Sequence, residues 1–189
     1  MGRTSDAKER LIQSGMALIH AGGYAQAGVQ EICLHAGVRK GSFYHFFASK
    51  SALALAVVER FRLFSEQFLD QALANDLPPL DRLTRLFHMT ALLQQQSQTE
   101  NGFVKGCPFG NLALEMSGHD ESLRHALMEV FANLQLRLQQ VLHEAAVTQA
   151  ENKAEALVNL FEGSILLAKT HNDPQIIHRM GAIARKLAR

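Results

Sequence analysis

The chain has 189 residues, of which 47% are hydrophobic, and a formal net charge of +1. This length and apolar content can support a sizeable core, in one domain or in a small domain joined to a larger one, and the near-neutral charge excludes a polycation. The longest apolar run, residues 52–58, is far shorter than a membrane span, and the N-terminus lacks the apolar core of a signal peptide. We therefore expect a cytoplasmic protein.

Basic charge is concentrated near the N-terminus, because residues 1–50 carry +3 and the remaining residues carry −2. The first predicted helix lies in this segment. Candidate N-caps stand at residues 4–6, and apolar residues from Leu11 to Ile19 recur on one face until Gly22 and Gly23 end the helix.

Residues 23–50 predict two short helices joined by a glycine turn and followed at once by a third helix, which is the pattern of a helix-turn-helix. We expect Gly37 to adopt a left-handed conformation, and Ile32, Val38 and Phe43 to lock the two helices together. The second helix of the pair then exposes donors and one aromatic ring, namely Arg39, Lys40, Ser42, Tyr44 and His45. Such side chains suit phosphate oxygens and base edges, although a glycine turn with a solvated basic face also occurs in ordinary helical proteins.

Helical periodicity dominates the rest of the chain, and no alternating apolar pattern indicates strands. We expect Asp173 to cap the last helix, with Pro174 at its first position. Six later helices are expected, at about residues 49–73, 79–96, 108–116, 120–146, 153–170 and 174–189. Together with the first three they make nine helices, which predicts an all-α protein.

The segment GVRKGSFYHFFASKSAL closely resembles the recognition-helix signature of the TetR family of bacterial transcriptional regulators. Matching positions are Gly37, Val38, Lys40, Gly41, Tyr44, Phe47, Ser49, Lys50 and Leu53. The resemblance covers residues 5–55 and implies a TetR-like fold, with a helix-turn-helix DNA-binding domain in residues 1–50 and a helical regulatory and dimerisation domain in residues 51–189. It also implies a homodimeric, ligand-responsive repressor whose partners are a palindromic operator in double-stranded DNA and a small-molecule or electrophile effector.

By matching position, the resemblance implies two groups of DNA contacts. Base contacts are expected from Arg39, Lys40, Ser42 and His45, and phosphate contacts from Gly28, Gln30, Tyr44 and Lys50. The chain departs from the family at Ala27 and Gly28, where the family often has threonine or serine. A glycine is tolerated as an N-cap and leaves the first N–H groups of the helix open to an anion, so phosphate contact there would come from the backbone.

The last two predicted helices carry apolar stripes, including Leu157, Phe161 and Ile165 in the first and Ile177 and Ile183 in the second. Such stripes can be ordinary core. The resemblance implies instead a four-helix interface with a second subunit, which is also what a two-fold symmetric DNA reader requires.

Cys107 stands between a glycine and a proline where a helix begins, and Lys105 is nearby. The positive end of a helix dipole and a lysine both favour the thiolate, so Cys107 is a candidate reactive thiol, with a small buried hydrophobe as the alternative. The surrounding sequence resembles a TetR branch that includes the N-ethylmaleimide and acrylate-responsive repressors, some of which sense electrophiles or oxidants through this cysteine. That resemblance implies Lys169 as a partner of Cys107, whereas Cys33 is interpreted as structural.

An effector pocket is expected in the helical bundle, with an apolar lining that includes Phe64, Phe87 and Phe109, each of which could equally be core. Candidate polar anchors are His88, Asn111 and Glu115. No cofactor is expected, and no metal, because the histidines lack partners at ligand spacing. A competing hypothesis is a thiol enzyme with Cys107 as nucleophile and a histidine as base, but it leaves the helix-turn-helix unexplained.

Overall fold

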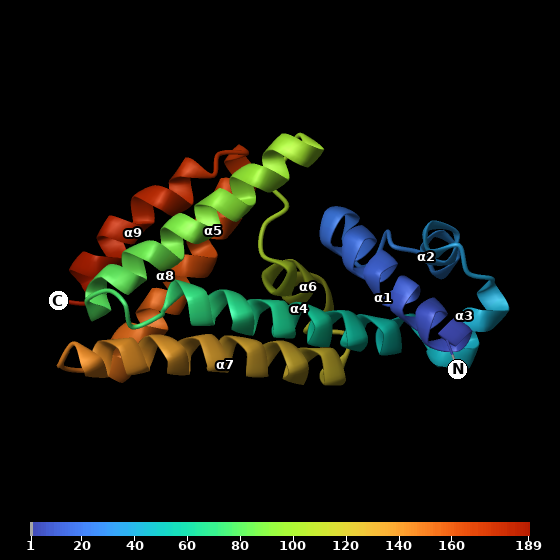
Figure 1. The fold of residues 1–189 in the computed structure, drawn as a ribbon, viewed down its shortest axis with the longest axis horizontal. Coiled ribbons are helices and arrows are strands. Elements are labelled where there is room, and N and C mark those ends of the chain that lie inside the picture. The colour runs from blue at the N-terminus through green and yellow to red at the C-terminus, as the bar shows by residue number, and fades with distance from the viewer. Residues whose placement is uncertain (1) are drawn as a thin grey trace. The chain divides into compact units, whose positions relative to one another are not determined.

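The computed structural model describes the backbone of residues 2–189 and the side chains of residues 6–189. The described chain folds into nine helices and no strand, which confirms the predicted all-α fold (Figure 1). Their bounds are α1 Gly2–Gly22, α2 Val29–Ala36, α3 Lys40–Phe46, α4 Lys50–Ala72, α5 Pro79–Asn101, α6 Pro108–Met116, α7 Glu121–Glu144, α8 Ala150–His171 and α9 Gln175–Leu187. Within the described part of the chain, no helix combines the length and the apolar character needed to cross a membrane.

The chain divides into two compact units. Unit 1 contains the residues up to Phe64 together with Pro108–Met128, and unit 2 contains Ser65–Cys107 together with Glu129–Arg189. The chain therefore passes from one unit to the other within α4, within α7, and between Cys107 and Pro108. The expected boundary at residue 50 separates a DNA-binding domain from a regulatory domain. It divides the chain by function and not by packing, and it stays a prediction.

Unit 1 is organised around the first three helices. Helix α1 packs against α2, α3 and α6, and α2 also contacts α3. Leu11, Ile32, Phe43 and Leu53 are fully buried in this unit and come from four different helices, α1 to α4. Burying each of these side chains contributes about 1.5–3 kcal/mol, so the short helices α2 and α3 depend on this shared core.

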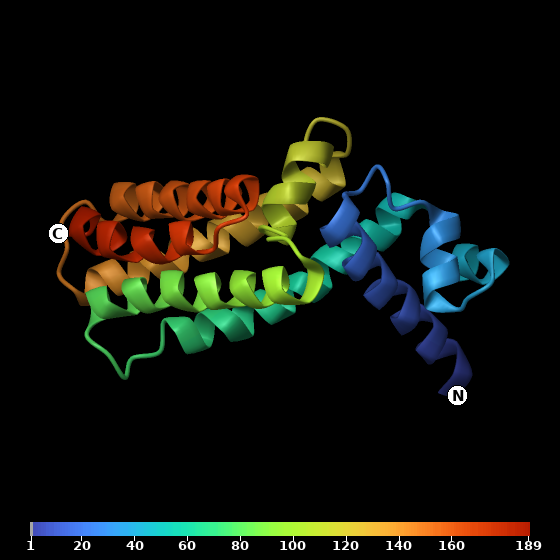
Figure 2. The same cartoon turned by 90° about the horizontal axis from the view of Figure 1, so that it is seen from above.

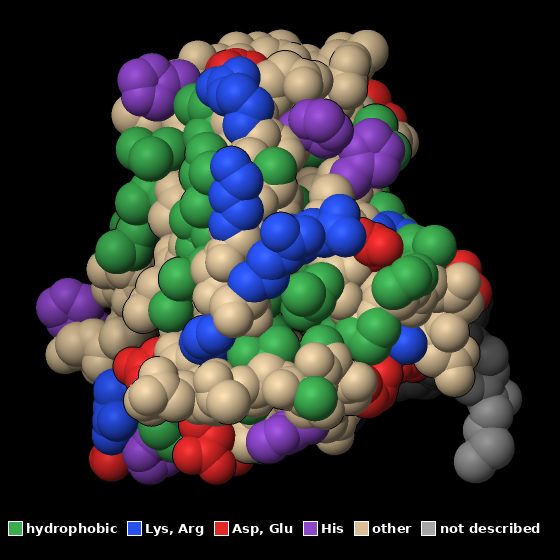
Figure 3. Space-filling model, turned by 90° about the vertical axis from the view of Figure 1, so that its left-hand side faces the viewer, with side chains coloured by type: hydrophobic (Ala, Val, Ile, Leu, Met, Phe, Trp, Pro, Cys, Tyr) green, Lys and Arg blue, Asp and Glu red, His purple; other side chains and the backbone are tan. Residues whose placement is uncertain are grey.

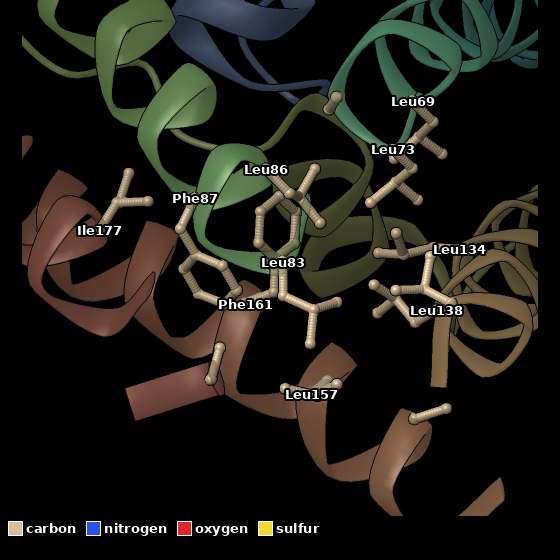
Figure 4. Close-up of a cluster of buried hydrophobic side chains, with 14 of the residues drawn as sticks. Leu69, Leu73, Leu83, Leu86, Phe87, Leu134, Leu138, Leu157, Phe161 and Ile177 are labelled. Atoms are coloured by element: carbon tan, nitrogen blue, oxygen red, sulfur yellow. The ribbon is translucent and has the colours of Figure 1, made fainter. Parts of the chain in front are cut away.

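Unit 2 is a helical bundle in which α5 lies beside α9, and α8 also packs against α9 (Figures 1 and 2). Figure 4 shows its core, where side chains from α4, α5, α7, α8 and α9 point toward one another. Its labelled members are Leu69, Leu73, Leu83, Leu86, Phe87, Leu134, Leu138, Leu157, Phe161 and Ile177. The contributing residues recur at helical spacing, as the apolar periodicity of the sequence predicts.

Two helix starts differ from the sequence prediction. Residues 4–6 do not cap α1, because the helix already begins at Gly2 and these residues lie inside it. Serine, threonine and aspartate are tolerated in the first turn of a helix. Helix α9 begins at Gln175 with Pro174 as its N-cap residue, one position later than predicted, although the Asp173 Oδ1 still accepts a hydrogen bond from the Gln175 N–H at 2.9 Å.

Helix α5 is longer than predicted and reaches Asn101 instead of residue 96. The extension is a polar run without apolar periodicity, so the pattern that identifies the rest of the helix is missing there. The helix ends at Gly102, whose φ of 83° lies in the left-handed region that favours glycine.

Candidate functional site

The turn between α2 and α3 is set by a left-handed glycine. Gly37 has φ 62° and ψ 36°, which confirms the sequence prediction. Its N–H donates to the Leu34 carbonyl at 3.1 Å, and the Val38 N–H donates to the Cys33 carbonyl at 2.9 Å. These two bonds satisfy carbonyl groups at the end of α2 and reverse the chain, so that α3 can begin at Lys40.

Burial and one side-chain cap hold the two helices in place. Ile32 and Phe43 are completely buried, and Val38 is half-buried, as the predicted lock requires. From α1, the Arg10 Nη1 donates to the Ala36 carbonyl at 3.0 Å and so binds the C-terminal end of α2. The helix-turn-helix is thus tied to α1 by both apolar packing and a charged hydrogen bond.

Most of α3 apart from the buried Phe43 is open to solvent. Tyr44 is 53% exposed, and its ring meets the ring of Phe43 edge to face, with centroids 5.2 Å apart. The exposed side chains are Arg39, Lys40, Ser42, Tyr44 and His45. All five predicted donors are therefore accessible to solvent: four lie on α3, and Arg39 is its N-cap residue.

The start of α2 has the predicted glycine cap. Gly28 adopts an extended conformation with φ −67° and ψ 147°, and no side-chain hydrogen bond caps the helix. Gln30, in the first turn, is exposed. A helix start that lacks a side-chain cap and has an exposed amide side chain nearby is chemically suited to a phosphate oxygen.

Lys50 is engaged within the protein. Its Nζ donates to the Tyr24 carbonyl at 2.8 Å and lies 4.1 Å from the centroid of the Tyr24 ring. The lysine at the start of α4 thereby holds the loop between α1 and α2. Its expected phosphate contact stays a prediction, and the structure adds this intramolecular role.

Glu115, expected as an effector anchor, supports the same loop. Its Oε1 accepts a hydrogen bond from the Tyr24 N–H at 3.0 Å, and its Oε2 accepts one from the Ala25 N–H at 2.9 Å. The preceding Gly23 has φ 89°, in the left-handed region. The carboxylate in the last turn of α6 thus fixes the backbone that leads into α2.

In unit 2, Cys107 lies directly before α6, is half-buried and takes no part in a disulfide. Burial raises the pKa of Glu162, on α8, to about 7, and hydrogen bonding with the Cys107 side chain offsets part of this rise. Cys33, by contrast, is buried in unit 1, and burial raises the pKa of its thiol, which fits a structural role.

The loop before Cys107 is held by two amide side chains. Gln94 on α5 both accepts from the Gly106 N–H at 3.0 Å and donates to the Gly106 carbonyl at 3.2 Å. Asn172, at the end of α8, accepts from the Val104 N–H at 2.9 Å and donates to the Gly102 carbonyl at 3.2 Å. The position of the thiol is thus set by a loop with several side-chain anchors.

The other candidate effector residues are divided between the units. Phe87 is 1% exposed and packs edge to face on Phe161 in the core of unit 2, with ring centroids 5.2 Å apart. Phe109 is buried in unit 1, whereas Phe64 is 56% exposed. Unit 1 holds Phe64, Phe109, Asn111 and Glu115, and unit 2 holds Phe87, His88, Cys107 and Lys169. Their roles in effector binding stay predictions.

Sequence reasoning did not identify Glu162, Gln94 or Asn172 as site residues. The available signal for Glu162 was that it is the single charged residue in a largely apolar stretch of α8, residues 157–168. Gln94 lies in a run of glutamines and has no such distinguishing context. Among the side chains of residues 6–189, no group of three or more His, Cys, Asp or Glu residues is placed to hold a metal ion.

A left-handed turn between two packed helices, followed by a basic, solvent-exposed helix, defines a helix-turn-helix DNA-binding protein. Residues 11–57 match the family model for bacterial regulatory proteins of the tetR family, and residues 79–183 match the model for the C-terminal domain of LmrA/YxaF-like transcriptional regulators. The chain belongs to the TetR family of transcriptional regulators. It is therefore a regulator and not an enzyme, which sets aside the thiol-enzyme hypothesis.

Individual relatives agree with this assignment. The transcriptional regulator AcuR from Cereibacter sphaeroides is 37% identical over 91% of this chain and 80% of its own length. The repressor NemR from Escherichia coli strain K12 is 32% identical over 65% of this chain and 60% of its own length. Among solved structures, a TetR regulatory protein from Rhodobacter sphaeroides has a TM-score of 0.84 at 33% identity, covering 96% of this chain and 98% of its own. The reduced form of E. coli NemR has a TM-score of 0.84 at 28% identity and covers 96% of both chains.

Proposed function

We propose that the protein is a homodimeric repressor that binds a palindromic operator in double-stranded DNA through α3 and leaves it when an effector acts at Cys107. The observation that carries the proposal is the exposed polar and basic face of α3 on a helix-turn-helix of the TetR family. In helix-turn-helix proteins the second helix enters the major groove, where base edges are distinguishable. A DNA partner also implies a cytoplasmic location.

The contacts we assign follow from side-chain chemistry and exposure. Guanidinium, ammonium, hydroxyl and imidazole groups can donate to base edges in the major groove, while amides and backbone N–H groups suit phosphates. Base contacts are assigned to Arg39, Lys40, Ser42 and His45, and phosphate contacts to Gly28, Gln30, Tyr44 and Lys50. Lys50 would share its ammonium between a phosphate and the Tyr24 carbonyl.

Alanine substitutions at Arg39 and Lys40 test the DNA contacts. Each should weaken binding to the operator upstream of the protein's own gene by about 10-fold or more at fixed salt, because each removes a charged donor from the groove. The matched control is Arg124→Ala, an exposed basic residue of α7 in the same unit, which should bind as the wild type does. Unchanged affinity of the Arg39 and Lys40 variants, measured by fluorescence anisotropy, would contradict the assignment.

The dimer interface is proposed on the exposed apolar side of α8 and α9. Large apolar side chains there are at least 40% exposed, namely Leu166, Leu167, Ile183 and Leu187. Figure 3, which looks onto the side of the molecule where the chain ends, shows hydrophobic side chains gathered along one edge next to Lys and Arg. Grouped apolar exposure marks a contact surface, and a two-fold dimer would place two recognition helices roughly 34 Å apart on DNA.

Regulation through Cys107 is supported by its place in the chain. The cysteine immediately precedes α6, and Glu115 in the last turn of α6 holds the loop that leads into α2. A change at Cys107 is therefore connected through one short helix to the DNA-reading element. To act as a switch, the effector must favour the non-binding conformation by several kcal/mol, about 5.5 for a full reversal of the populations.

The test of regulation compares the wild type with Cys107→Ser. DNA binding is measured at fixed salt with and without one equivalent of a thiol-reactive electrophile. We expect loss of tight binding in the wild type only, since the buried Cys33 is the remaining thiol of the variant. If neither protein responds, covalent sensing is wrong, and if both respond, the signal does not pass through Cys107.

A further inference from the structure

The turn between α8 and α9 contains an asparagine in the left-handed conformation. Asn172 is the C-cap residue of α8, with φ 52° and ψ 38°. Its own N–H donates to the Lys169 carbonyl at 3.3 Å, and the Asp173 N–H donates to the Ala168 carbonyl at 2.9 Å, so backbone groups alone end the helix. Glycine fills such a position at the lowest cost, and the side chain of Asn172 is therefore not needed to end α8.

That side chain binds the loop between α5 and α6. The Asn172 Oδ1 accepts a hydrogen bond from the Val104 N–H at 2.9 Å, and its Nδ2 donates to the Gly102 carbonyl at 3.2 Å. The carbonyl of Asn172 accepts a third bond, at 2.5 Å, from the Gln98 Nε2 on α5. Helix α5, the loop that follows it and the α8–α9 turn, all in unit 2, therefore meet at one residue.

The conformation of this loop depends on its side-chain anchors. Val104 is 1% exposed, which draws the loop into the protein and limits the access of water to its backbone. A buried N–H that loses its partner costs more than an ordinary hydrogen bond contributes. Gly102 and Gly106, on either side of Val104, have φ values of 83° and 82°, and glycine reaches many other conformations as readily. Hydrogen bonds to side chains, rather than backbone preference, therefore hold the loop in place.

The residue that binds the loop lies between the two helices of the proposed dimer interface. The exposed Leu167 on α8 precedes Asn172 by five residues, and the exposed Ile183 on α9 follows it by eleven. A partner that binds α8 and α9 stabilises the arrangement in which the two helices and their turn are ordered. Through the Asn172 side chain, the same arrangement orders the loop, which leads by way of Cys107 into α6.

We infer that Asn172 is a positioning residue that couples the dimerisation helices to the loop before α6, an inference that rests on the proposed dimer through α8 and α9. Dimer formation stabilises the bound conformation of the loop. Because coupling between two equilibria is reciprocal, a change that releases the loop weakens the dimer by the same factor. An effector that moves the loop thereby acts on the dimer interface as well as on α6.

The test follows hydrogen exchange of the Val104 N–H by NMR in the full-length protein. Asn172→Gly removes the side chain and keeps a residue suited to the left-handed turn, whereas Asn172→Asp keeps the acceptor for the Val104 N–H. The matched control is Asn152→Ala, an exposed asparagine in the first turn of the same helix. Urea unfolding measures the global stability of each variant.

We expect Asn172→Gly to speed exchange of the Val104 N–H by about 10-fold, because two hydrogen bonds that oppose opening of the loop are lost. Asn172→Asp should keep most of the protection, and Asn152→Ala all of it. The global stability of Asn172→Gly should not fall, since glycine ends a helix at least as well as asparagine. If Asn172 served only to end α8, exchange at Val104 would not change.

A double-mutant cycle measures the coupling. Leu167→Asp combined with Ile183→Asp, which should separate the subunits, is made in the wild type and in Asn172→Gly. In the wild type, separation should speed exchange at Val104 by about threefold or more, a factor typical of coupled sites. In Asn172→Gly it should have no further effect, because the connection is already cut. Dilution of the wild-type protein gives the same comparison without a substitution at the interface.

Two results would overturn the inference. Wild-type exchange at Val104 in Asn172→Gly would show that the side chain does not position the loop. An equal effect of subunit separation in both backgrounds would show that the coupling does not pass through Asn172. Sedimentation distinguishes these failures from that of the proposed dimer: if α8 and α9 form no interface, the coupling fails with the dimer, while the exchange rate of Asn172→Gly still decides the positioning role.

Discussion

Replacing Gly23 by alanine tests whether Glu115 holds the loop that leads into the helix-turn-helix. Gly23 has φ 89°, and an added Cβ would lie 2.7 Å from the Glu115 Oε1, closer than real Cβ contacts come. The alanine would therefore strain its own backbone and displace the carboxylate that accepts the N–H groups of Tyr24 and Ala25.

The expected loss is the sum of two effects. A non-glycine residue in a left-handed conformation costs about 1–2 kcal/mol. Losing two hydrogen bonds to a partly exposed carboxylate adds up to about 1 kcal/mol for each bond, a discounted value because solvent can replace them. We therefore expect Gly23→Ala to lower the free energy of unfolding by about 1–4 kcal/mol.

Urea unfolding followed by circular dichroism measures this change. Gly118→Ala is the matched control, because a Cβ there meets nothing within 4 Å and the residue has no positive φ. In a Glu115→Ala background, the cost of Gly23→Ala should fall to the backbone part, about 1–2 kcal/mol, since no carboxylate is left to displace. A Gly23→Ala loss below about 0.5 kcal/mol, or strict additivity of the two substitutions, would refute the reasoning.

Three further predictions concern stability and assembly. The pKa of Glu162 is raised from 4.5 to about 7. Between these two pH values the folded protein binds more protons than the unfolded chain, so the free energy of unfolding falls as the pH rises from 4.5 to about 7. In urea titrations, the free energy of unfolding of Glu162→Gln should rise relative to that of the wild type by up to about 3 kcal/mol as the pH goes from 4.5 to 8. If the difference between the two proteins does not change with pH, the pKa of Glu162 is not raised in the folded state. Leu167→Asp combined with Ile183→Asp should convert the proposed dimer to a monomer in sedimentation experiments, because charges would replace exposed apolar contacts; a persisting dimer would place the interface elsewhere. Arg10→Ala should lower the free energy of unfolding by about 0.5–1.5 kcal/mol through loss of the bond to the Ala36 carbonyl, and a neutral effect would mean that water substitutes for it.

The sequence alone determined the features whose physical causes are local. The left-handed turn at Gly37, the glycine N-cap of α2 at Gly28 and the exposed face of α3 all follow from the preferences of a few neighbouring residues. The nine helices were also predictable from the sequence, because apolar residues recur along it with the 3.6-residue period of an α-helix. Where that period stops, in the polar end of α5, the prediction also stopped short.

Only the tertiary structure decided which distant groups meet. Cys107 and Glu162 are 55 residues apart, and Glu115 reaches the N–H groups of Tyr24 and Ala25 across about 90 residues of chain. No periodicity or motif encodes such pairs, because they depend on how the helices pack and on where burial raises a pKa. Local chemistry therefore identified the DNA-reading helix, whereas packing assigned Glu115 to the loop and gave the candidate sensor thiol an acid partner.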